Sequence, residues 1–421
     1  MPRFNTLADW LAWQESLHPH KIDLGLERVA AVAERLQLLQ PAFTVVTVAG
    51  TNGKGSSVAM LEAVLRAAGY QTGTYTSPHL LRYNERIRIN GLEIDDASLC
   101  SAFDAVDTAR GTVSLSYFEF GTLAALLLFR QQSPEIVILE VGLGGRLDAV
   151  NVVDSDVALI TSIDIDHCAW LGNDRESIGR EKAGILRAAH PAICSDAKAP
   201  ESIENRAREL GASWYCLGAE YHYQVGVGKW SWQGVTRAFE NLPLPALVGQ
   251  HQLDNAAGVL MVLEMLSARH PVSREAIELG LQTVRLDGRF QLFRGAVELV
   301  VDVAHNAASA RRLSGILREN EVSGSTSLVL GMLDDKDIQQ FTRALRAIVD
   351  AWYLTTPDSD RGLSSASLLA GMCGLPTGSK VRCFPDTASA LRQAKSDASA
   401  GDRIVVTGSF VTVAEALASH V

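Results

Sequence analysis

A glycine-rich segment at residues 48–56 has the composition of a loop that binds phosphate. It reads Val-Ala-Gly-Thr-Asn-Gly-Lys-Gly-Ser and stands between a run of β-branched apolar residues and an expected helix. Glycines let the backbone wrap round an anion, amides at a helix N-terminus favour negative charge, and Lys54 adds a cation. The common P-loop pattern is not met, because Val48 and Gly55 occupy the places of its first glycine and its hydroxyl residue. The strand–loop–helix context still favours nucleotide binding over the alternative, a glycine turn with a solvated lysine.

Polar residues also stand where other apolar runs end. Glu140 lies in the run at residues 136–141, and a carboxylate at the end of a buried strand is unfavourable unless a charge neutralises it. A magnesium ion bound to ATP is one possible partner, and an ion pair with Arg146 is the alternative. His167 by itself is a poor magnesium ligand, because magnesium prefers hard oxygen ligands, so a core histidine fits its position equally well. Ser77 by itself indicates only a cap or a turn.

Several other residues have simpler interpretations. Lys182, in the segment Arg-Glu-Lys-Ala-Gly-Ile, is expected on the solvated surface. Cys168 is expected to be a small buried side chain rather than a nucleophile. Trp230 and Trp232 lie beside glycines and indicate a β-hairpin on the surface of the first domain.

The apolar runs alternate with helical patterns along the chain. Strands are expected at residues 43–49, 71–76, 136–141 and 157–161, and helices at 22–39, 57–68 and 122–131. This alternation predicts a mostly parallel sheet with helices on both faces, in which ligands bind beyond the carboxyl ends of the strands. A second βα series follows, with strands expected at 298–303, 327–330, 352–355, 381–384 and 403–407.

We therefore predict an α/β chain of two domains. Residues 1–285 are expected to form a P-loop-type, mostly parallel sheet domain, and residues 297–421 a smaller Rossmann-like α/β domain. Residues 286–296 are expected to be a linker that acts as a hinge.

Composition narrows the class of protein. The chain has 421 residues, 47% of them hydrophobic, and a net charge of −10 without a basic stripe, which argues against a nucleic-acid partner. The six cysteines form no Cys-x-x-Cys pair, so neither zinc nor a redox dithiol is indicated. The longest apolar run, residues 123–129, is far shorter than the ~20 residues that span a bilayer, and no signal peptide is indicated. We expect a cytoplasmic monomer without a membrane partner.

Taken in order, the motifs resemble those of the folylpolyglutamate synthase family, a relative of the Mur ligases. The resemblance is greatest to its bifunctional dihydrofolate synthase/folylpolyglutamate synthase members and extends from about residue 17 to 413. Ala307 stands where the family often has Pro, and Ser56 where Thr is also common. The motifs that carry the resemblance are residues 50–56, 77–80, 140–148, 166–172 and 302–306.

The resemblance implies roles that the residues alone do not. It assigns ATP binding to Thr51, Asn52, Gly53, Lys54, Gly55, Ser56, Asn255, Arg289 and Asp302. It assigns one or two magnesium ions to Ser77, Glu140 and His167. It assigns the pterin substrate to Ser16, Leu17, His18, Pro19, Ser116, Tyr117, Phe118, Glu119 and Leu147. It assigns catalytic roles to Lys54, Lys182, His305 and Asp302, with Lys182 carbamylated on its side chain.

The implied activity is ATP-dependent ligation of L-glutamate to 7,8-dihydropteroate and to reduced folates. The carboxylate is expected to be activated as an acyl phosphate, and closure of the second domain over the nucleotide is expected to exclude water. Folylpolyglutamate synthase activity alone is one alternative. A Mur-type ligase acting on a UDP-sugar peptide is another, but only 49 residues precede Gly50, which leaves too little chain for a UDP-binding domain. A nucleotide-dependent switch without ligation is a third.

Overall fold

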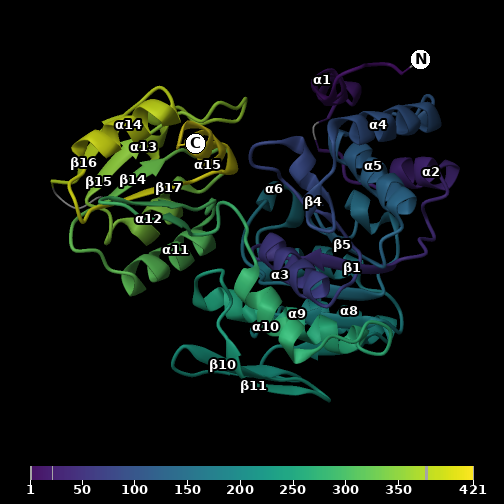
Figure 1. Ribbon diagram of the computed structural model, residues 1–421. Helices are drawn as coiled ribbons and strands as arrows, with labels where there is room; N and C mark the ends of the chain where they lie inside the picture. Colours follow the sequence, from purple (N-terminus) through teal and green to yellow (C-terminus); the bar gives the residue numbers. More distant parts are fainter. Residues whose placement is uncertain (1, 21, 375–377, 421) are drawn as a thin grey trace. The chain divides into compact units, whose positions relative to one another are not determined.

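Figure 1 shows the computed structural model, which describes residues 2–20, 22–374 and 378–420. The described chain divides into two compact units. The first comprises Met1–Ala246 with Gln252–Val284, and the second comprises Leu247–His251 with Arg285–Val421. Residues 286–296, the expected linker, belong to the second unit and contain one of its strands, β12 (Gln291–Phe293).

The sheet of the first unit is mostly parallel. β1 (Thr44–Ala49) lies between β5 (Ile136–Glu140) and β6 (Val157–Ile160) and pairs with both in parallel. These strands are buried along their whole length, so they need apolar residues on both faces, and their sequences are continuous apolar runs rather than alternating ones. The sheet order is β4 (Leu92–Glu93), β3 (Ile87–Ile89), β2 (Thr72–Tyr75), β5, β1, β6, β7 (Pro191–Cys194) and β8 (Ser213–Cys216), with β3 antiparallel to both of its neighbours.

Helices cover both faces of this sheet (Figure 1). On one face α3 (Lys54–Ala67) packs against β1, β2 and β5, and α10 (Arg274–Thr283) packs against α3. On the other face four helices share a hydrophobic core with the sheet: α1 (Leu7–Leu17), α2 (Glu27–Arg35), α4 (Asp96–Arg110) and α5 (Tyr117–Gln132). The remaining helical segments of this part of the chain are η1 (Tyr83–Arg86), η2 (Ala149–Val152), α6 (Cys168–Leu171), α7 (Arg175–Lys182), η3 (Ala183–Ile185), α8 (Glu201–Leu210) and α9 (Gln250–Leu266).

The helix expected at 57–68 is α3, which begins three residues earlier, at Lys54. The other two expected helices differ from their bounds because side chains at their starts form specific contacts. The expected helix at 22–39 is only α2, since Gly25 disfavours helix and the Asp23 carboxylate is held by His18 and Arg28. α5 begins before residue 122, because Ser116 and Glu119 form a capping box at its N-terminus. The Glu119 carboxylate accepts a hydrogen bond from the Ser116 amide at 2.7 Å, and the Ser116 hydroxyl accepts one from the Glu119 amide at 3.3 Å.

The second unit contains its own mostly parallel sheet. Its order is β12, β13 (Glu298–Val301), β17 (Arg403–Thr407), β14 (Thr326–Leu330), β15 (Ala351–Leu354) and β16 (Lys380–Cys383), with only the β12–β13 pair antiparallel. The sheet forms a hydrophobic core with three helices: α11 (Ala307–Glu319), α12 (Ile338–Leu345) and α13 (Ser365–Gly371). Other contacts of the sheet are made by α14 (Thr387–Asp397) and α15 (Phe410–His420).

The expected tryptophan hairpin belongs to a small antiparallel sheet. β10 (Lys229–Gln233) pairs with β9 (His222–Val225) on one side and β11 (Ala238–Pro243) on the other. Most residues of this sheet are exposed or partly exposed, but the Trp230 and Trp232 side chains are buried beneath it, and the Trp232 indole donates a hydrogen bond to the Ala257 carbonyl of α9 at 3.2 Å. The sheet therefore packs on a helix, which its local sequence did not indicate.

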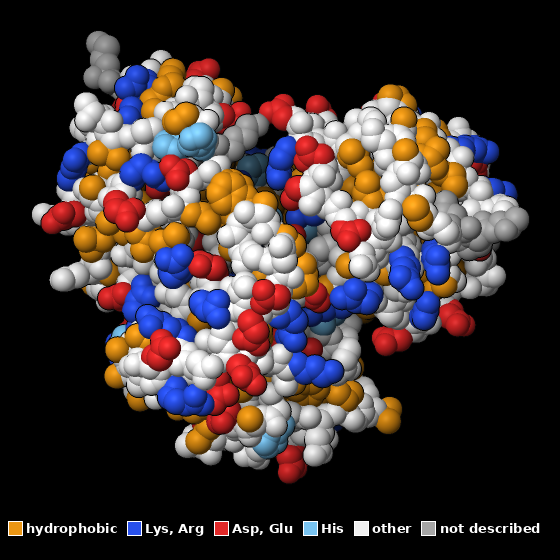
Figure 2. All heavy atoms as spheres, turned by 180° about the vertical axis from the view of Figure 1, so that it is seen from behind, with side chains coloured by type: hydrophobic (Ala, Val, Ile, Leu, Met, Phe, Trp, Pro, Cys, Tyr) orange, Lys and Arg blue, Asp and Glu red, His pale blue; other side chains and the backbone are white. Residues whose placement is uncertain are grey.

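Among the helices of the described residues, none combines the length and the hydropathy needed to cross a membrane. On the face shown in Figure 2, Lys and Arg side chains are interspersed with Asp and Glu side chains.

Candidate active site

The loops that follow the parallel strands of the first unit bring most of the expected site residues to one edge of the sheet. β1 leads into the loop at residues 50–53, and the neighbouring strands β2, β5 and β6 lead into Ser77, Glu140 and the loop at 161–167. Because these strands are parallel, their carboxyl ends lie together, as expected for a ligand site.

The loop after β1 has a backbone that only glycine accommodates. Gly53, the N-cap of α3, has φ 97° and ψ −10°. A Cβ atom there would overlap the Oδ1 of Asn255 and lie 3.1 Å from its Cγ. Asn255 is buried in α9 and donates a hydrogen bond to the Gln252 side chain at 3.0 Å. The structure thus places Asn255, expected on the nucleotide side, directly against the loop.

Two lysines converge on one carbonyl of this loop. The Lys54 and Lys182 ammonium groups donate hydrogen bonds to the Gly50 carbonyl at 3.1 and 2.9 Å. The surface position expected for Lys182 is wrong, because its side chain is buried at the end of α7 and crosses to the loop after β1. Burial lowers the pKa of Lys182 to about 7, and the Lys54 charge acts in the same direction. The sequence between residues 180 and 185 contains no signal for this contact.

A buried carboxylate lies near the two lysines and had been assigned no role of its own. Asp148 accepts hydrogen bonds from the amides of Leu143 and Val150 at 2.8 and 3.0 Å. Burial raises the pKa of Asp148 to about 6, opposed by those amides and by the Lys54 charge. The available signal in the sequence was an aspartate that follows the Gly144–Gly145 pair in the loop after β5.

The structure brings two of the three expected magnesium ligands together. The Ser77 amide donates a hydrogen bond to the Glu140 carboxylate at 3.2 Å, since β2 and β5 are paired neighbours. The Arg146 guanidinium forms an ion pair with Glu181 at 3.0 Å, so it has a carboxylate partner of its own. His167 has a left-handed backbone, φ 52°, and precedes α6. Cys168, expected to be buried, is exposed.

The donor set suits a magnesium ion brought in by a nucleotide. Within residues 2–20, 22–374 and 378–420, no group of three or more His, Cys, Asp or Glu side chains is arranged to hold a metal on its own. Magnesium is usually held by one or two carboxylates together with substrate phosphates and water, so Glu140 with a neighbouring hydroxyl is a sufficient protein contribution. Ser77 and Glu140 fit that description.

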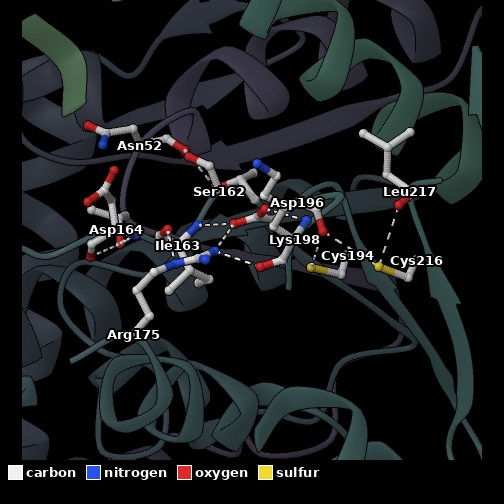
Figure 3. A network of polar contacts seen from close by, with 12 residues as sticks. Asn52, Ser162, Ile163, Asp164, Arg175, Cys194, Asp196, Lys198, Cys216 and Leu217 are labelled. Atoms are coloured by element: carbon white, nitrogen blue, oxygen red, sulfur yellow. Dashed lines mark hydrogen bonds and ion pairs between the residues drawn. The ribbon is translucent and has the colours of Figure 1, made fainter. Parts of the chain in front are cut away.

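Figure 3 shows how the loop after β6 is tied to the phosphate loop. The Ser162 hydroxyl donates to the Asn52 carbonyl at 3.0 Å. In addition, the Thr51 hydroxyl donates to the Asp164 carbonyl at 3.0 Å. Behind this loop the Asp196 carboxylate accepts hydrogen bonds from the Ile163 amide at 2.9 Å and from the Arg175 guanidinium at 2.8 Å. The loop after β6 is therefore held from both sides.

The residues expected at the pterin substrate lie in two segments that are distant in sequence. In the first, Ser16 and Pro19 are exposed and Leu17 and His18 are partly buried. The second opens α5, where Ser116 and Glu119 are buried. Phe118 stacks on Tyr75, and a Cβ at Gly142 would lie only 2.7 Å from the Phe118 ring, so the ring lies against the loop after β5. Tyr117 lies edge-on to Tyr83, and Leu147 is partly buried in the same post-β5 loop.

In the second unit, Asp302 organises the start of a loop. Its carboxylate accepts hydrogen bonds from the amides of Phe290 and Ala304, both at 2.8 Å, and burial raises its pKa. The Arg289 guanidinium lies 5.2 Å from the ring of Phe410, an aromatic residue that sequence reasoning missed.

His305 and the helix that follows it complete this part of the second unit. The His305 ring lies 5.9 Å from the Phe410 ring, and its Nδ1 is 2.9 Å from the Val303 carbonyl. Asn306 caps α11 and Ala307 is its first residue, a position that proline also suits. The replacement of proline by Ala307 is therefore compatible with the helix start.

Comparisons with known proteins agree with this geometry. Residues 48–263 match the family model of the Mur ligase middle domain, and residues 288–410 match that of the Mur ligase, glutamate ligase domain. The dihydrofolate synthase/folylpolyglutamate synthase of Escherichia coli (strain K12) is 46% identical over 411 residues, which cover 98% of this chain and 94% of that protein. The corresponding protein of Haemophilus influenzae is 39% identical over 97% of this chain and 96% of its own length.

Solved structures extend the similarity to the whole fold. E. coli FolC in complex with DHPP and ADP superposes with a TM-score of 0.93 at 45% identity, covering 98% of this chain and 97% of that chain. A bifunctional folylpolyglutamate synthase/dihydrofolate synthase with Mn, AMPPNP and L-glutamate bound superposes with a TM-score of 0.91 at 47% identity, covering 99% of this chain and 98% of that one.

Proposed function

The chain belongs to the dihydrofolate synthase/folylpolyglutamate synthase family, and we propose that it joins L-glutamate to 7,8-dihydropteroate and to reduced folates with consumption of ATP. The observation that carries this proposal is the convergence of Lys54 and Lys182 on the Gly50 carbonyl, beside the glycine loop. That arrangement places the Lys54 cation beside the loop where a nucleotide phosphate would bind, next to Lys182, whose pKa is lowered by burial. The ligands named for the similar structures, a nucleotide, a divalent metal and glutamate, are those that the proposed reaction requires.

The difficult step is the attack of one anion on another. A carboxylate is a poor electrophile, so we propose that its oxygen takes the γ-phosphoryl group of ATP, which gives an acyl phosphate and releases ADP. The neutral amine of glutamate then attacks the acyl carbonyl, forming the amide bond and releasing inorganic phosphate and a proton. Two like charges about 4 Å apart repel by about 4 kcal/mol at an effective dielectric of about 20. That repulsion corresponds to about a thousandfold in rate. Lys54, held next to the loop amides, is placed to offset it.

Ser77, Glu140 and His167 are the residues that would hold one or two magnesium ions at the carboxyl edge of the sheet. When bound there, magnesium supplies positive charge to the phosphate oxygens. The protein's own contribution is to fix the Ser77–Glu140 contact through the paired strands β2 and β5 and to hold the loop that carries His167.

We further propose that Lys182 is carbamylated. Burial lowers the pKa of Lys182 to about 7, so its neutral amine is populated near physiological pH; this amine can add CO₂, forming an N–C bond and releasing a proton. The product is an anion, which places oxygen atoms beside Lys54 instead of a second cation. Incubation with ¹³C-labelled bicarbonate should give a carbamate resonance by NMR. Lys182→Met should lose it, whereas Lys198→Met, which changes an exposed lysine, should retain it. A spectrum without that resonance in the wild type contradicts carbamylation.

For the second unit we propose that Asp302 and His305 orient the nucleotide or glutamate. Asp302→Ala removes the acceptor for two amides and should disorder this loop as well as lower turnover. His305→Ala leaves those hydrogen bonds in place, so it reports on the imidazole itself. Unchanged turnover in both variants contradicts the assignment.

The function is tested by incubating the purified protein with ATP, magnesium and L-glutamate. One reaction contains 7,8-dihydropteroate and the other a reduced folate monoglutamate, and mass spectrometry detects a product heavier by one glutamyl residue alongside ADP. Product in both reactions is the expected result. Product with the folate alone would show polyglutamylation only, and nucleotide binding without product in either would refute the ligase assignment.

A further inference from the structure

One arginine connects the two distant segments assigned to the pterin substrate. Arg28 lies in the first turn of α2, outside both segments. Its guanidinium forms an ion pair with Asp23 at 2.8 Å and another with Glu119 at 3.1 Å. The same group also donates a hydrogen bond to the Asp23 carbonyl at 2.9 Å. Arg28 therefore contacts the chain that follows residues 16–19 and the start of α5 at once.

On the N-terminal side, the contact with Asp23 continues to His18. The Asp23 carboxylate is 3.0 Å from His18 Nε2, and His18 Nδ1 is 2.8 Å from the Ser114 hydroxyl. The Ser114 hydroxyl donates in turn to the Leu17 carbonyl at 3.2 Å. Hydrogen bonding by His18, followed by the Arg28 charge, lowers the pKa of Asp23, so this carboxylate stays ionised. Leu17 and His18 are thus held against Ser114, which precedes α5, and His18 is joined to Asp23.

On the α5 side, Arg28 meets a carboxylate that already has a structural task. Glu119 is 3% exposed and closes the capping box with the Ser116 amide. A buried carboxylate needs a compensating charge, and Arg28 is an ion-pair partner for it. The planar guanidinium makes contacts with two carboxylates from fixed directions, which a lysine ammonium on a flexible stem cannot reproduce.

We propose that Arg28 is a positioning residue for the pteroyl acceptor: by bridging Asp23 and Glu119 it fixes residues 16–19 relative to residues 116–119. This inference rests on the proposed function, and it assigns Arg28 to recognition of the pterin-bearing substrate rather than to ATP or to the chemical step. Lys54 and Lys182 donate to the Gly50 carbonyl, whereas Arg28 pairs with Asp23 and Glu119, so the effect of losing this bridge should be selective.

The test compares Arg28→Met with Arg35→Met in steady-state kinetics. Arg35 lies in the same helix and also makes tertiary hydrogen bonds, to the Ala109 and Arg110 carbonyls at 2.9 Å, but it contacts neither substrate segment. We expect Arg28→Met to raise the KM for the pteroyl acceptor about ten-fold, the usual effect of losing a charge-assisted hydrogen bond. The KM for ATP should stay within about two-fold, since that ligand's site is unchanged, and Arg35→Met should leave all constants near wild type.

Two further variants keep the proposal testable if Arg28→Met folds poorly. Arg28→Lys retains a positive charge but not the planar guanidinium that reaches both carboxylates, so we expect a smaller rise in the acceptor KM than for Arg28→Met. Asp23→Asn keeps the side-chain shape and removes the charge, and it should raise the same KM. An acceptor KM that is unchanged in all three variants, or one that moves equally in Arg35→Met, overturns the proposal. Absence of product from the wild type would instead refute the proposed function itself.

Discussion

Replacing Gly53 by alanine tests how the phosphate loop is built. The residue has φ 97°, a conformation that costs an L-residue about 1–2 kcal/mol, so alanine strains the backbone whatever surrounds it. Reduced freedom of the unfolded chain offsets about 0.4–1 kcal/mol of that cost. The new methyl group would also overlap Asn255 Oδ1, so Asn255 must move and its hydrogen bond to Gln252, worth about 1 kcal/mol, is lost.

The chain contains a matched control at the other end of the same helix. Gly69 follows the C-cap of α3 with φ 90°, and a Cβ there would have no neighbour within 4 Å. Gly69→Ala therefore has the backbone strain without the collision. We expect a loss of unfolding free energy of about 1 kcal/mol for Gly69→Ala and about 2 kcal/mol for Gly53→Ala.

Urea unfolding followed by tryptophan fluorescence measures both losses, and calorimetry measures ATP affinity. Gly53→Ala should weaken ATP binding at least about ten-fold, because the loop and Asn255 both shift, whereas Gly69→Ala should not change it. In an Asn255→Ala background the additional loss caused by Gly53→Ala should fall toward that of Gly69→Ala, since the overlap is relieved. Equal effects of the two glycine substitutions on stability and on ATP affinity would refute the reasoning.

Three further predictions concern charged groups of the same site. Lys54→Ala should abolish turnover with little loss of stability, because it removes a cation beside the phosphates and not a core contact. The glutamyl-transfer assay measures turnover and circular dichroism measures folding. A wild-type rate in this variant would contradict the nucleotide assignment. For Lys182 the pKa of about 7 in the folded state lies below the usual value of 10.5. Between these values the unfolded state binds more protons, so the contribution of Lys182 to stability rises with pH. The measurement is the rise in unfolding free energy from pH 7 to pH 9 in CO₂-free buffer. This rise should be smaller in Lys182→Met than in wild type by about 2–3 kcal/mol. For Asp148 the pH dependence has the opposite sign, because burial raises its pKa from 3.8 to about 6. Its contribution to the unfolding free energy is fully present below pH 3.8 and is lost as the pH rises through 6. Asp148→Asn should remove a decline of about 3 kcal/mol over that window, and an unchanged pH profile would show that the carboxyl is not buried as described.

The sequence alone was enough to place the strands and their loops. The runs at 43–49, 71–76, 136–141 and 157–161 correspond to β1, β2, β5 and β6 with ends shifted by one residue at most, because fully buried parallel strands need continuous apolar residues. The glycine loop could also be predicted from the sequence, since the backbone conformations that require glycine depend on neighbouring residues. Chain order and the rule that ligands bind beyond the carboxyl ends of parallel strands pointed to Glu140 as a site residue, whereas the role of Ser77 was implied only by the family resemblance.

Tertiary structure decided where the long side chains go. Nothing around Lys182 indicates that its ammonium reaches the Gly50 carbonyl, and nothing around Arg28 indicates that it joins Asp23 to Glu119. The same limit explains why the expectation for Cys168 is wrong, since this residue is exposed. It also explains why the sequence did not indicate that Trp230 and Trp232 are buried where the small sheet packs on α9. Hydrophobic periodicity and turn chemistry act between near neighbours and are written in the sequence, whereas burial, pKa and ion pairing depend on which distant segments the fold brings into contact.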